Sequence, residues 1–284
     1  MKCGKLYLCA TPIGNLEDLS IRALRTLIGV DMIAAEDTRV SMKLLNSFNI
    51  KASVYSYHEH NKKERGEYII NCLLKGIDVA LISDAGTPCI SDPGYDLVNL
   101  ARDAGIEIES IPGACACIDA LTLSGMPADK FVFEGFLSRK NKERKKSLSS
   151  LERETRTMVF YESPHHLLDT LQDLCETLGG DRKIFIAREL TKHYEETQNF
   201  TLLDALKYYT DCQPRGEFVL VVAGISKKNL KQLDKKLWEN MTLSEHMKFY
   251  TSQGIEKKEA MKRVAQDRDM SKREVYQALL EIEN

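Results

Sequence analysis

The sequence predicts an α/β fold of two α/β domains followed by a helical appendage. Across residues 6–223, short apolar runs bounded by polar and turn residues alternate with amphipathic segments, a pattern that indicates α/β domains and, in the first of them, a mostly parallel sheet. A turn-rich stretch, Gly125–Lys130, interrupts the alternation before it restarts, which is typical of a linker. We therefore expect domains at residues 1–124, 125–225 and 226–284.

The first domain is expected to contain five strands that alternate with helices. Val79–Ile82 is apolar at every position, which indicates a strand buried on both faces of a parallel sheet. Ser20 can cap one helix, and Pro93 is expected at the first position of another, after Ser91 or Asp92. The other expected strands are Leu6–Ala10, Asp31–Ala35, Ala52–Tyr57 and Ile106–Ile111, with helices near 20–28, 41–48, 67–76, 93–105 and 112–124.

The second domain repeats this alternation of strands and helices. Ser163 follows one apolar run and is expected to cap a helix whose first turn contains Pro164. The expected strands are Phe131–Phe136, Thr157–Tyr161, Lys183–Ala187 and Gly216–Ala223, with helices within 139–156, 164–178 and 202–209.

From Ser226 onwards the strand pattern ends and lysines become frequent. Thr242-x-x-Glu245 and Ser271-x-x-Glu274 match the capping-box signature of helix N-termini, and a short turn at 267–270 joins two helical patterns. The segment has the size of a helix-turn-helix. The alternative is a helical pair that only packs on the rest of the protein.

Composition excludes several classes of protein. The formal net charge of −2 gives no global nucleic-acid signal, so any basic character must be local. No apolar stretch approaches membrane-spanning length, and no signal peptide precedes the first strand. The eight cysteines include no C-x-x-C pair, so we expect a cytoplasmic protein with reduced thiols and no membrane partner.

Known cofactor and metal motifs are missing from the sequence. Neither G-x-G-x-x-G nor G-x-x-x-x-G-K-[ST] occurs, which disfavours dinucleotide dehydrogenases and nucleotide triphosphatases. Cys115-x-Cys117 has no second Cys or His pair nearby, so buried packing is favoured over a metal site and no metal is expected.

Four loops follow expected strands of the first domain, at 11–15, 36–39, 83–93 and 112–117. The carboxyl ends of parallel strands lie at one edge of a sheet, where ligands bind, so these loops should converge into a pocket. Asp84, followed by small residues, suits a polar ligand with hydroxyls or amines. Each loop alone could be only a tight turn.

Charged side chains end two of the expected strands. Glu36, Asp37 and Arg39 could clamp a substrate or supply a base, or could form an ion pair and a helix cap. Glu189 and Lys192 end a strand of the second domain and would face the same cleft. Lys192 can accept a proton only if burial or nearby cations lower its pKa; otherwise it would contact phosphate.

A basic run at 139–146 contains six basic residues and one Glu. It follows a strand and begins a helix, which would place it near the mouth of the cleft. Contact with a phosphate backbone is one interpretation, and a solvated loop and helix face is the other.

Several motifs, in this order along the chain, resemble one family. They are Thr11-Pro-Ile-Gly-Asn-Leu16, Ala35-Glu-Asp-Thr-Arg39, Ser83-Asp-Ala-Gly-Thr-Pro88, Ser91-Asp-Pro-Gly94, Ile111-Pro-Gly113, Phe160-Tyr-Glu-Ser163 and Ala187-Arg-Glu-Leu-Thr-Lys192. The chain resembles, over essentially its whole length, the ribosomal RNA small-subunit methyltransferase I family of the tetrapyrrole methylase superfamily. The resemblance implies two α/β domains of the tetrapyrrole methylase type, with S-adenosylmethionine in the cleft between them.

The resemblance also implies a substrate and a set of donor-binding residues. The expected reaction methylates the 2′-hydroxyl of a cytidine in the decoding region of 16S ribosomal RNA, within the small ribosomal subunit, and homodimers are usual in the superfamily. One departure is that Cys115 and Cys117 stand where small Pro- or Ala-like residues are expected. Carried over by position, the donor would be lined by Pro12, Asp84, Gly86, Thr87, Pro112, Gly113, Ala114, Phe160, Tyr161, Leu190 and Gly216.

In-line methyl transfer from a sulfonium to a ribose oxygen needs no metal, but a base would help. Lys192, Glu189 and Asp37 are the candidate bases, with Glu36 and Arg39 orienting, and the sequence does not choose among them.

Two rival functions remain open. Methylation of a tetrapyrrole carbon would need neither the basic run nor the lysine-rich appendage. A non-catalytic RNA-binding module is disfavoured by the intact Asp84–Pro88 segment.

Overall fold

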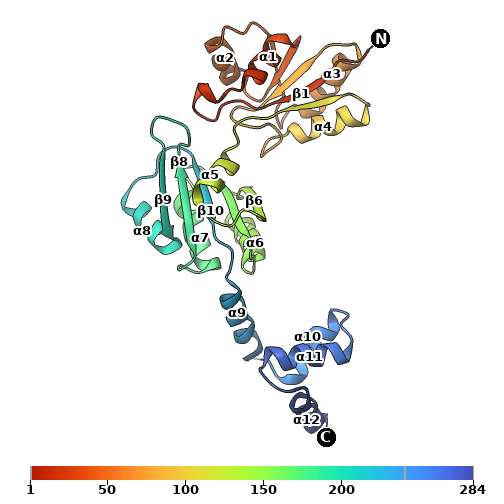
Figure 1. The fold of residues 1–284 in the computed structure, drawn as a ribbon, viewed down its shortest axis with the longest axis vertical. Coiled ribbons are helices and arrows are strands. Elements are labelled where there is room, and N and C mark those ends of the chain that lie inside the picture. The colour runs from red at the N-terminus through yellow and green to blue at the C-terminus, as the bar shows by residue number, and fades with distance from the viewer. Residues whose placement is uncertain (1, 240, 284) are drawn as a thin grey trace. The chain divides into compact units, whose positions relative to one another are not determined.

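The computed structural model describes residues 2–239 and 241–283 of the 284-residue chain (Figure 1). The chain divides into two compact units. The α/β unit comprises Met1–Leu151 and Arg156–Ala223, and the helical unit comprises Glu152–Thr155 and Gly224–Asn284. Both sheets lie in the α/β unit, so the boundary expected at residue 124 stays a prediction. Among the described residues, no helix has the length and apolar character that a membrane crossing requires.

The first sheet of the α/β unit has the strand order β3-β2-β4-β1-β5, and all of its pairings are parallel. This confirms the five strands and the parallel arrangement expected for this part of the chain. Its strands are β1 (Leu6–Cys9), β2 (Met32–Ala35), β3 (Ser53–Ser56), β4 (Val79–Ile82) and β5 (Ile108–Ile111). Its helical elements are η1 (Leu16–Asp18), α1 (Ile21–Gly29), α2 (Thr38–Ser47), α3 (Lys62–Leu74), α4 (Gly94–Asp103) and α5 (Ala116–Ser124).

Two helices of this part begin later than expected. Pro93 occupies the N-cap position of α4 and not its first turn, because the carboxylate of Asp92 already accepts the N–H of Gly94 at 2.7 Å. Helix α5 begins at Ala116 and not at Pro112. The carbonyl of Ala114 instead accepts a hydrogen bond from the Thr87 hydroxyl at 2.9 Å, which holds the segment before α5 extended.

The second sheet has the order β6-β7-β10-β8-β9 and is mixed. Only β6 and β7 are parallel, and the remaining pairings are antiparallel. The mostly parallel arrangement expected for the first domain therefore does not extend to this half of the unit. Its strands are β6 (Phe131–Phe136), β7 (Thr157–Glu162), β8 (Lys183–Arg188), β9 (Glu196–Thr201) and β10 (Phe218–Val222), and its helices are α6 (Asn141–Leu151), α7 (Leu167–Leu178) and α8 (Leu202–Asp211).

The sequence did not predict β9, and it placed the start of α7 too early. Strand β9 lies at the edge of its sheet, and none of its residues is fully buried, so no alternation of buried apolar residues marks it. Helix α7 starts at Leu167 because Ser163 does not cap it. The Ser163 N–H instead donates to its neighbour Glu162 at 2.7 Å.

The two faces of each sheet pack into separate cores. Alternate residues of β4 face the two cores of the first sheet, as expected for a strand covered on both sides. One face of the second sheet packs against α6, α7 and α8. The other face packs against Cys117, Ala120 and Leu121 of α5. Helix α5 follows a strand of the first sheet but packs on the second, so the segment before α5 connects the two halves.

The helical unit contains α9 (Lys227–Glu239), α10 (Leu243–Ser252), α11 (Lys257–Asp267) and α12 (Lys272–Glu283). Both expected capping boxes are confirmed. Thr242 Oγ1 accepts the N–H of Glu245 at 3.2 Å and the Glu245 carboxylate accepts the N–H of Thr242 at 2.8 Å, and Ser271 pairs with Glu274 in the same way. Helices α9 and α10 precede the expected pair, α11 and α12. The unit has its own apolar core, centred on Ala260, Val264 and Val275.

Candidate functional site

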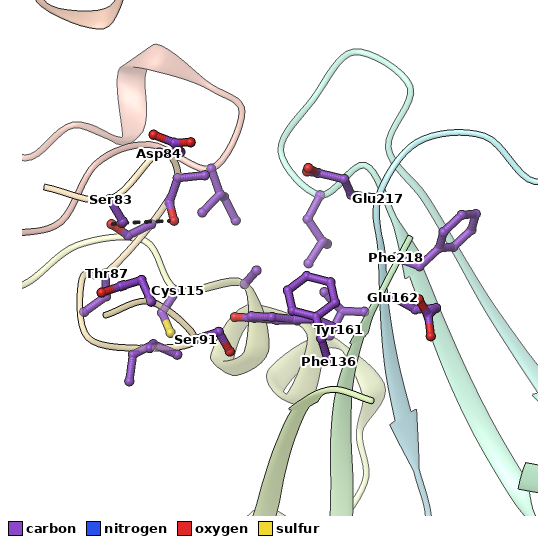
Figure 2. Close-up of a pocket in the computed structure, with 18 of the residues that line it drawn as sticks. Ser83, Asp84, Thr87, Ser91, Cys115, Phe136, Tyr161, Glu162, Glu217 and Phe218 are labelled. Atoms are coloured by element: carbon purple, nitrogen blue, oxygen red, sulfur yellow. Dashed lines mark hydrogen bonds between the residues drawn. The ribbon is translucent and has the colours of Figure 1, made fainter. Parts of the chain in front are cut away.

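A pocket of about 440 Å³ lies in the α/β unit, between loops of the first sheet and strand ends of the second (Figure 2). All four loops expected to converge contribute to its lining, through Ile13, Glu36, the 83–92 segment and Cys115. The convergence predicted from the parallel first sheet is therefore confirmed.

The opposite wall comes from the ends of β6, β7 and β8 and from the start of β10. Because β10 runs antiparallel to β7 and β8, Phe218 pairs with both Glu162 and Arg188. This register brings the segment before β10 to the same edge as the carboxyl ends of β7 and β8. Figure 2 shows Tyr161, Phe136 and Glu217 on this wall.

The turn after β4 is fixed by hydrogen bonds to the carbonyl of Gly86. The Thr11 N–H donates to this oxygen at 2.9 Å and the Ser83 hydroxyl at 3.1 Å. Gly86 has φ +83°, and a Cβ atom there would lie 3.0 Å from Cγ2 of Ile13. A side chain is therefore disfavoured both by backbone strain and by the close approach of the first loop.

Two further contacts join the loops across the pocket. The Thr87 hydroxyl donates to the carbonyl of Ala114 at 2.9 Å. The phenol oxygen of Tyr161 accepts the N–H of Cys117 at 3.1 Å. Burial raises the pKa of Tyr161, so this phenol keeps its proton. These contacts hold β7 and the start of α5 in fixed positions at the pocket.

Cys115 and Cys117 lie side by side at the start of α5, with their Sγ atoms 3.5 Å apart. The hydrogen bond between the two thiols, together with backbone N–H groups of the helix start, lowers the pKa of Cys115. The same contact and burial raise the pKa of Cys117. Cys115 lines the pocket, so this thiol of lowered pKa lies at the ligand space.

Acidic side chains gather at the carboxyl ends of β2 and β4. Burial first, and then the charges of Asp84 and Asp92, raise the pKa of Glu36. No hydrogen bond or ion pair of Glu36 exists among the described side chains. Asp92 accepts the N–H groups of Cys89 and Gly94 and so holds the loop in place. Glu36 has no such contact among the described residues, so its carboxylate is available to a ligand.

Asp37 and Arg39 form the cap and ion pair that the sequence offered as the alternative interpretation. Asp37 caps α2 by accepting the Arg39 N–H at 2.8 Å, and its other oxygen lies 2.7 Å from the Arg39 guanidinium. These contacts lower the pKa of Asp37 to about 2. The N–H of Asp37 donates to Asp84 at 2.9 Å, which ties the loops after β2 and β4 together.

Lys192 is held between two carboxylates. Its Nζ lies 2.8 Å from Oε1 of Glu189 and 2.9 Å from Oε2 of Glu217. Burial acts to lower the pKa of Lys192, but these two hydrogen bonds raise it overall. Lys192 is therefore a charged ammonium at neutral pH and has no free lone pair with which to accept a proton.

The loop that carries Glu189 and Lys192 is strained and closely packed. Glu189 and Thr191 have φ values of +50° and +62°, a region that non-glycine residues seldom adopt and that often marks functional sites. A Cβ atom at Gly216 would lie 2.5 Å from Cγ of Glu189, and one at Gly14 would lie 2.4 Å from Cγ of Lys192. Glycines thus let two other loops approach this one.

The residues expected at the site separate into those that line the pocket and those that do not. Lining residues are Glu36, Asp84, Gly86, Thr87, Tyr161, Glu189, Leu190 and Lys192. Those outside the lining are Pro12, Asp37, Arg39, Pro112, Gly113, Ala114, Phe160 and Gly216. Phe160 is fully buried in the core beneath α6, α7 and α8, because successive side chains of a strand point to opposite faces and Tyr161 takes the pocket side.

Sequence reasoning missed Phe136, Glu162 and Glu217, which all line the pocket. Glu217 directly precedes β10. In a parallel sheet that position would lie at the far edge, so the mixed topology of the second sheet hid it. Phe136 was visible as the last residue of an expected strand, and its 62% exposure could not be anticipated.

Comparison with known families gives one match that spans most of the α/β unit. A profile described as "Tetrapyrrole (Corrin/Porphyrin) Methylases" matches residues 5–206. Among curated proteins, the chain is 48% identical to "Ribosomal RNA small subunit methyltransferase I" of Halalkalibacterium halodurans, over 96% of this chain and 93% of that one. It is 47% identical to the Bacillus subtilis protein of the same name, over 97% and 94%.

A shorter relative of the same name comes from Thermotoga maritima. It is 48% identical over 221 residues, which are 78% of this chain but 99% of that protein. About a fifth of this chain therefore has no counterpart there.

Two solved structures of similar fold and low sequence identity are methyltransferases. "Crystal structure of the methyltransferase CobJ" aligns with a TM-score of 0.60 at 19% identity, over 78% of this chain and 94% of that one. A Thermus thermophilus uroporphyrin-III C-methyl transferase, complexed with S-adenyl homocysteine, aligns with a TM-score of 0.54 at 17% identity, over 77% and 97%. These likenesses support the fold.

Proposed function

Because the chain belongs to the tetrapyrrole methylase family, and within it to the ribosomal RNA small subunit methyltransferase I proteins, we propose that it methylates ribosomal RNA. In this proposal S-adenosylmethionine donates a methyl group to the 2′-hydroxyl of a cytidine ribose in the decoding region of 16S ribosomal RNA. The observation that carries the proposal is the pocket at which the family's motif loops converge.

The pocket suits a donor that carries a sulfonium cation. Its volume of about 440 Å³ falls in the ~300–1,000 Å³ range of small-molecule sites. Glu36, Asp84 and Asp92 place carboxylates along one side, which favours a cationic ligand. Ile13, Leu190 and further apolar residues supply the hydrophobic contact. The glycine turn at Gly86 lets a ligand approach the backbone closely.

The donor supplies the methyl group on a sulfonium that is already electrophilic, so the protein's task is to position the ribose oxygen and take its proton. Glu36 is the best candidate for the proton acceptor. Its raised pKa makes it more basic than an ordinary glutamate, and it has no hydrogen-bond partner among the described residues. Lys192 is protonated, Glu189 is engaged by Lys192, and the pKa of Asp37 is about 2.

The proposal includes a setting for the enzyme. We expect the small ribosomal subunit as the substrate, the cytoplasm as the location and a homodimer as the oligomeric state. Light scattering of the purified protein tests the dimer directly, since a mass near twice 32.2 kDa is expected.

Methyl transfer to small subunits tests the function. Subunits from cells that lack this protein are incubated with it and with S-adenosylmethionine labelled in the methyl group, and the RNA is then mapped by mass spectrometry. We expect one added methyl group on the ribose of one cytidine. Label on a base, or transfer to a tetrapyrrole with none to RNA, would overturn the proposal.

A further inference from the structure

A second, smaller cavity adjoins the donor pocket. Its volume is about 110 Å³, and it shares Phe136, Glu162 and Ser163 with the larger pocket. Figure 2 shows Phe136 and Glu162 on the side of Tyr161. A ligand that fills the donor pocket and extends past these shared residues would therefore enter the second cavity.

Cationic side chains line this cavity. Arg144 is only 5% exposed, and its Nε donates to the Asp173 carboxylate at 2.6 Å. That ion pair holds the planar guanidinium of a buried arginine at the cavity wall. Arg139 also lines the cavity, is exposed, and makes no ion pair among the described residues. Two arginines at one small cavity suit an oxyanion, which guanidinium groups bind in bidentate geometry.

The start of α7 lies beside the same cavity, whose lining includes its N-cap residue. His166, the N-cap residue, lines the cavity, and its side chain makes no capping hydrogen bond. The N–H groups of the first turn of this 12-residue helix thus remain available. Such N–H groups favour a bound anion.

Glu162 is the one acidic group in the lining, and it is already satisfied. Its two oxygens accept the Ser163 N–H at 2.7 Å and the Thr170 hydroxyl at 2.6 Å. Both oxygens of Glu162 are thus engaged, Asp173 balances Arg144, and Arg139 is the cation of the lining that no carboxylate pairs among the described residues.

We propose that this cavity binds the phosphate group next to the acceptor ribose. The inference rests on the proposed function and names a subsite for its RNA substrate. In RNA the 3′-phosphate is attached to the carbon beside the one that bears the 2′-hydroxyl, so a ribose in the donor pocket brings a phosphate to the adjoining cavity. Exposed Lys142 and Lys146 of α6 form no ion pairs among the described side chains, so positive charge continues outward for neighbouring phosphates.

The oxyanion could also be the carboxylate of the methyl donor, and the variant Arg139→Ala separates the two sources. Lys207→Ala is the matched control, since Lys207 is an exposed basic residue of α8 that lines neither cavity. Both variants are assayed for transfer to small subunits at several salt concentrations, and for donor binding by calorimetry. Arg139→Lys is added, because a point charge replaces only part of a bidentate contact.

Arg139→Ala is expected to lower kcat/KM by about tenfold or more and to reduce the slope of log rate against log salt by about one. The donor affinity of Arg139→Ala should stay within twofold of the wild-type value. The kcat/KM of Arg139→Lys should lie between that of the wild type and that of Arg139→Ala. If Arg139→Ala had the same kcat/KM and the same salt dependence as Lys207→Ala, the proposed subsite would be overturned. An equal loss of donor affinity would assign the cavity to the donor carboxylate and would overturn it as well.

Small inhibitors give a second, independent measurement. Cytidine 3′-monophosphate should inhibit wild-type transfer about tenfold better than cytidine, and Arg139→Ala should remove this preference while cytidine inhibits both proteins equally. A preference that survives Arg139→Ala contradicts the proposal. If the wild-type protein methylates no small subunit, the proposed function itself fails, whereas a normal rate with an unaffected variant refutes only the subsite.

Discussion

Nζ of Lys192 lies 2.8 Å from Oε1 of Glu189, and the same oxygen accepts the backbone N–H of Glu217 at 2.8 Å. One carboxylate oxygen thus connects the loop after β8 to the segment before β10. The ammonium group neutralises Glu189, which stays ionised because its hydrogen bonds from Lys192 and from that N–H outweigh the effect of its burial on its pKa.

Replacement of Lys192 by Met should reduce methyl transfer without changing its pH dependence. The loss of the ammonium leaves Glu189 without its counter-ion and disturbs the loop, so we expect kcat/KM to fall about 10–100-fold, as when a charged partner is removed. Lys192→Arg should recover part of the loss. A change in the acidic limb of the pH–rate profile would contradict this structural role and would favour Lys192 as the base.

Glu36→Gln should have the larger effect on the chemical step. Loss of a general base typically costs about 10²–10⁴ in rate, and we expect kcat to fall within that range while donor affinity falls much less. The raised pKa of Glu36 predicts that wild-type kcat rises with pH through a range above that of an ordinary glutamate. This acidic limb should disappear in Glu36→Gln, as measured by kcat across pH 4–8. Its persistence would refute the assignment.

Glu36→Gln should make the folded protein more stable, although it should make the enzyme slower. A carboxyl whose pKa is higher in the folded protein than in the unfolded chain favours folding at low pH, and this contribution is lost as pH rises through the folded pKa. Burial and the neighbouring carboxylates give Glu36 such a raised pKa. Glu36→Gln removes the buried charge, so its thermal midpoint at pH 7 should exceed that of the wild type. A lower midpoint would contradict the assigned environment.

Gly86→Ala tests the donor pocket against a matched control. Gly86 and Gly105 have similar φ values of +83° and +69°, but a Cβ at Gly86 would lie 3.0 Å from Ile13 whereas one at Gly105 would meet nothing within 4 Å. Backbone strain should cost both alanine variants about 1 kcal/mol of stability, and the contact with Ile13 should add to the loss in Gly86→Ala. Only Gly86→Ala should also weaken donor binding, by about tenfold, in calorimetry. Equal donor affinity in the two variants would remove Gly86 from the site.

The first sheet and its loops could be predicted from the sequence because their signals are local. Val79–Ile82 has no polar residue, so a buried parallel strand was the natural interpretation, and the converging loops followed from it. The second sheet could not be predicted in the same way. Strand direction depends on pairing between distant segments, and the sequence of β10 does not by itself indicate that this strand runs antiparallel to its neighbours.

The direction of β10 explains why Glu217 was not expected at the pocket. Glu217 directly precedes β10, which is antiparallel to its neighbours, and it lines the pocket; before a parallel strand it would lie at the opposite edge of the sheet. The choice among the candidate bases also required the structure, since the hydrogen bonds of Lys192 and Asp37 decide their protonation. The side chain of Phe160 lies in the core and not in the pocket lining, because a motif resemblance does not indicate which of two adjacent strand residues faces the core.

Cys115 provides a direct chemical probe of donor binding. Its thiol lines the pocket, and its hydrogen bond with Cys117 lowers its pKa, which favours the reactive thiolate. Iodoacetamide should therefore modify Cys115 faster than Cys117, which is 4% exposed. Saturating S-adenosylmethionine should slow the modification of Cys115 by about tenfold or more, because a bound ligand covers the thiolate.

Exposed Cys212 lies outside the pocket lining and serves as the internal reference, since the donor should not change its rate. Fragment mass spectra of the digested protein assign each modified cysteine. Equal labelling of Cys115 with and without the donor would show that the donor binds elsewhere, because a thiolate in the wall of its pocket cannot remain accessible once the pocket is filled.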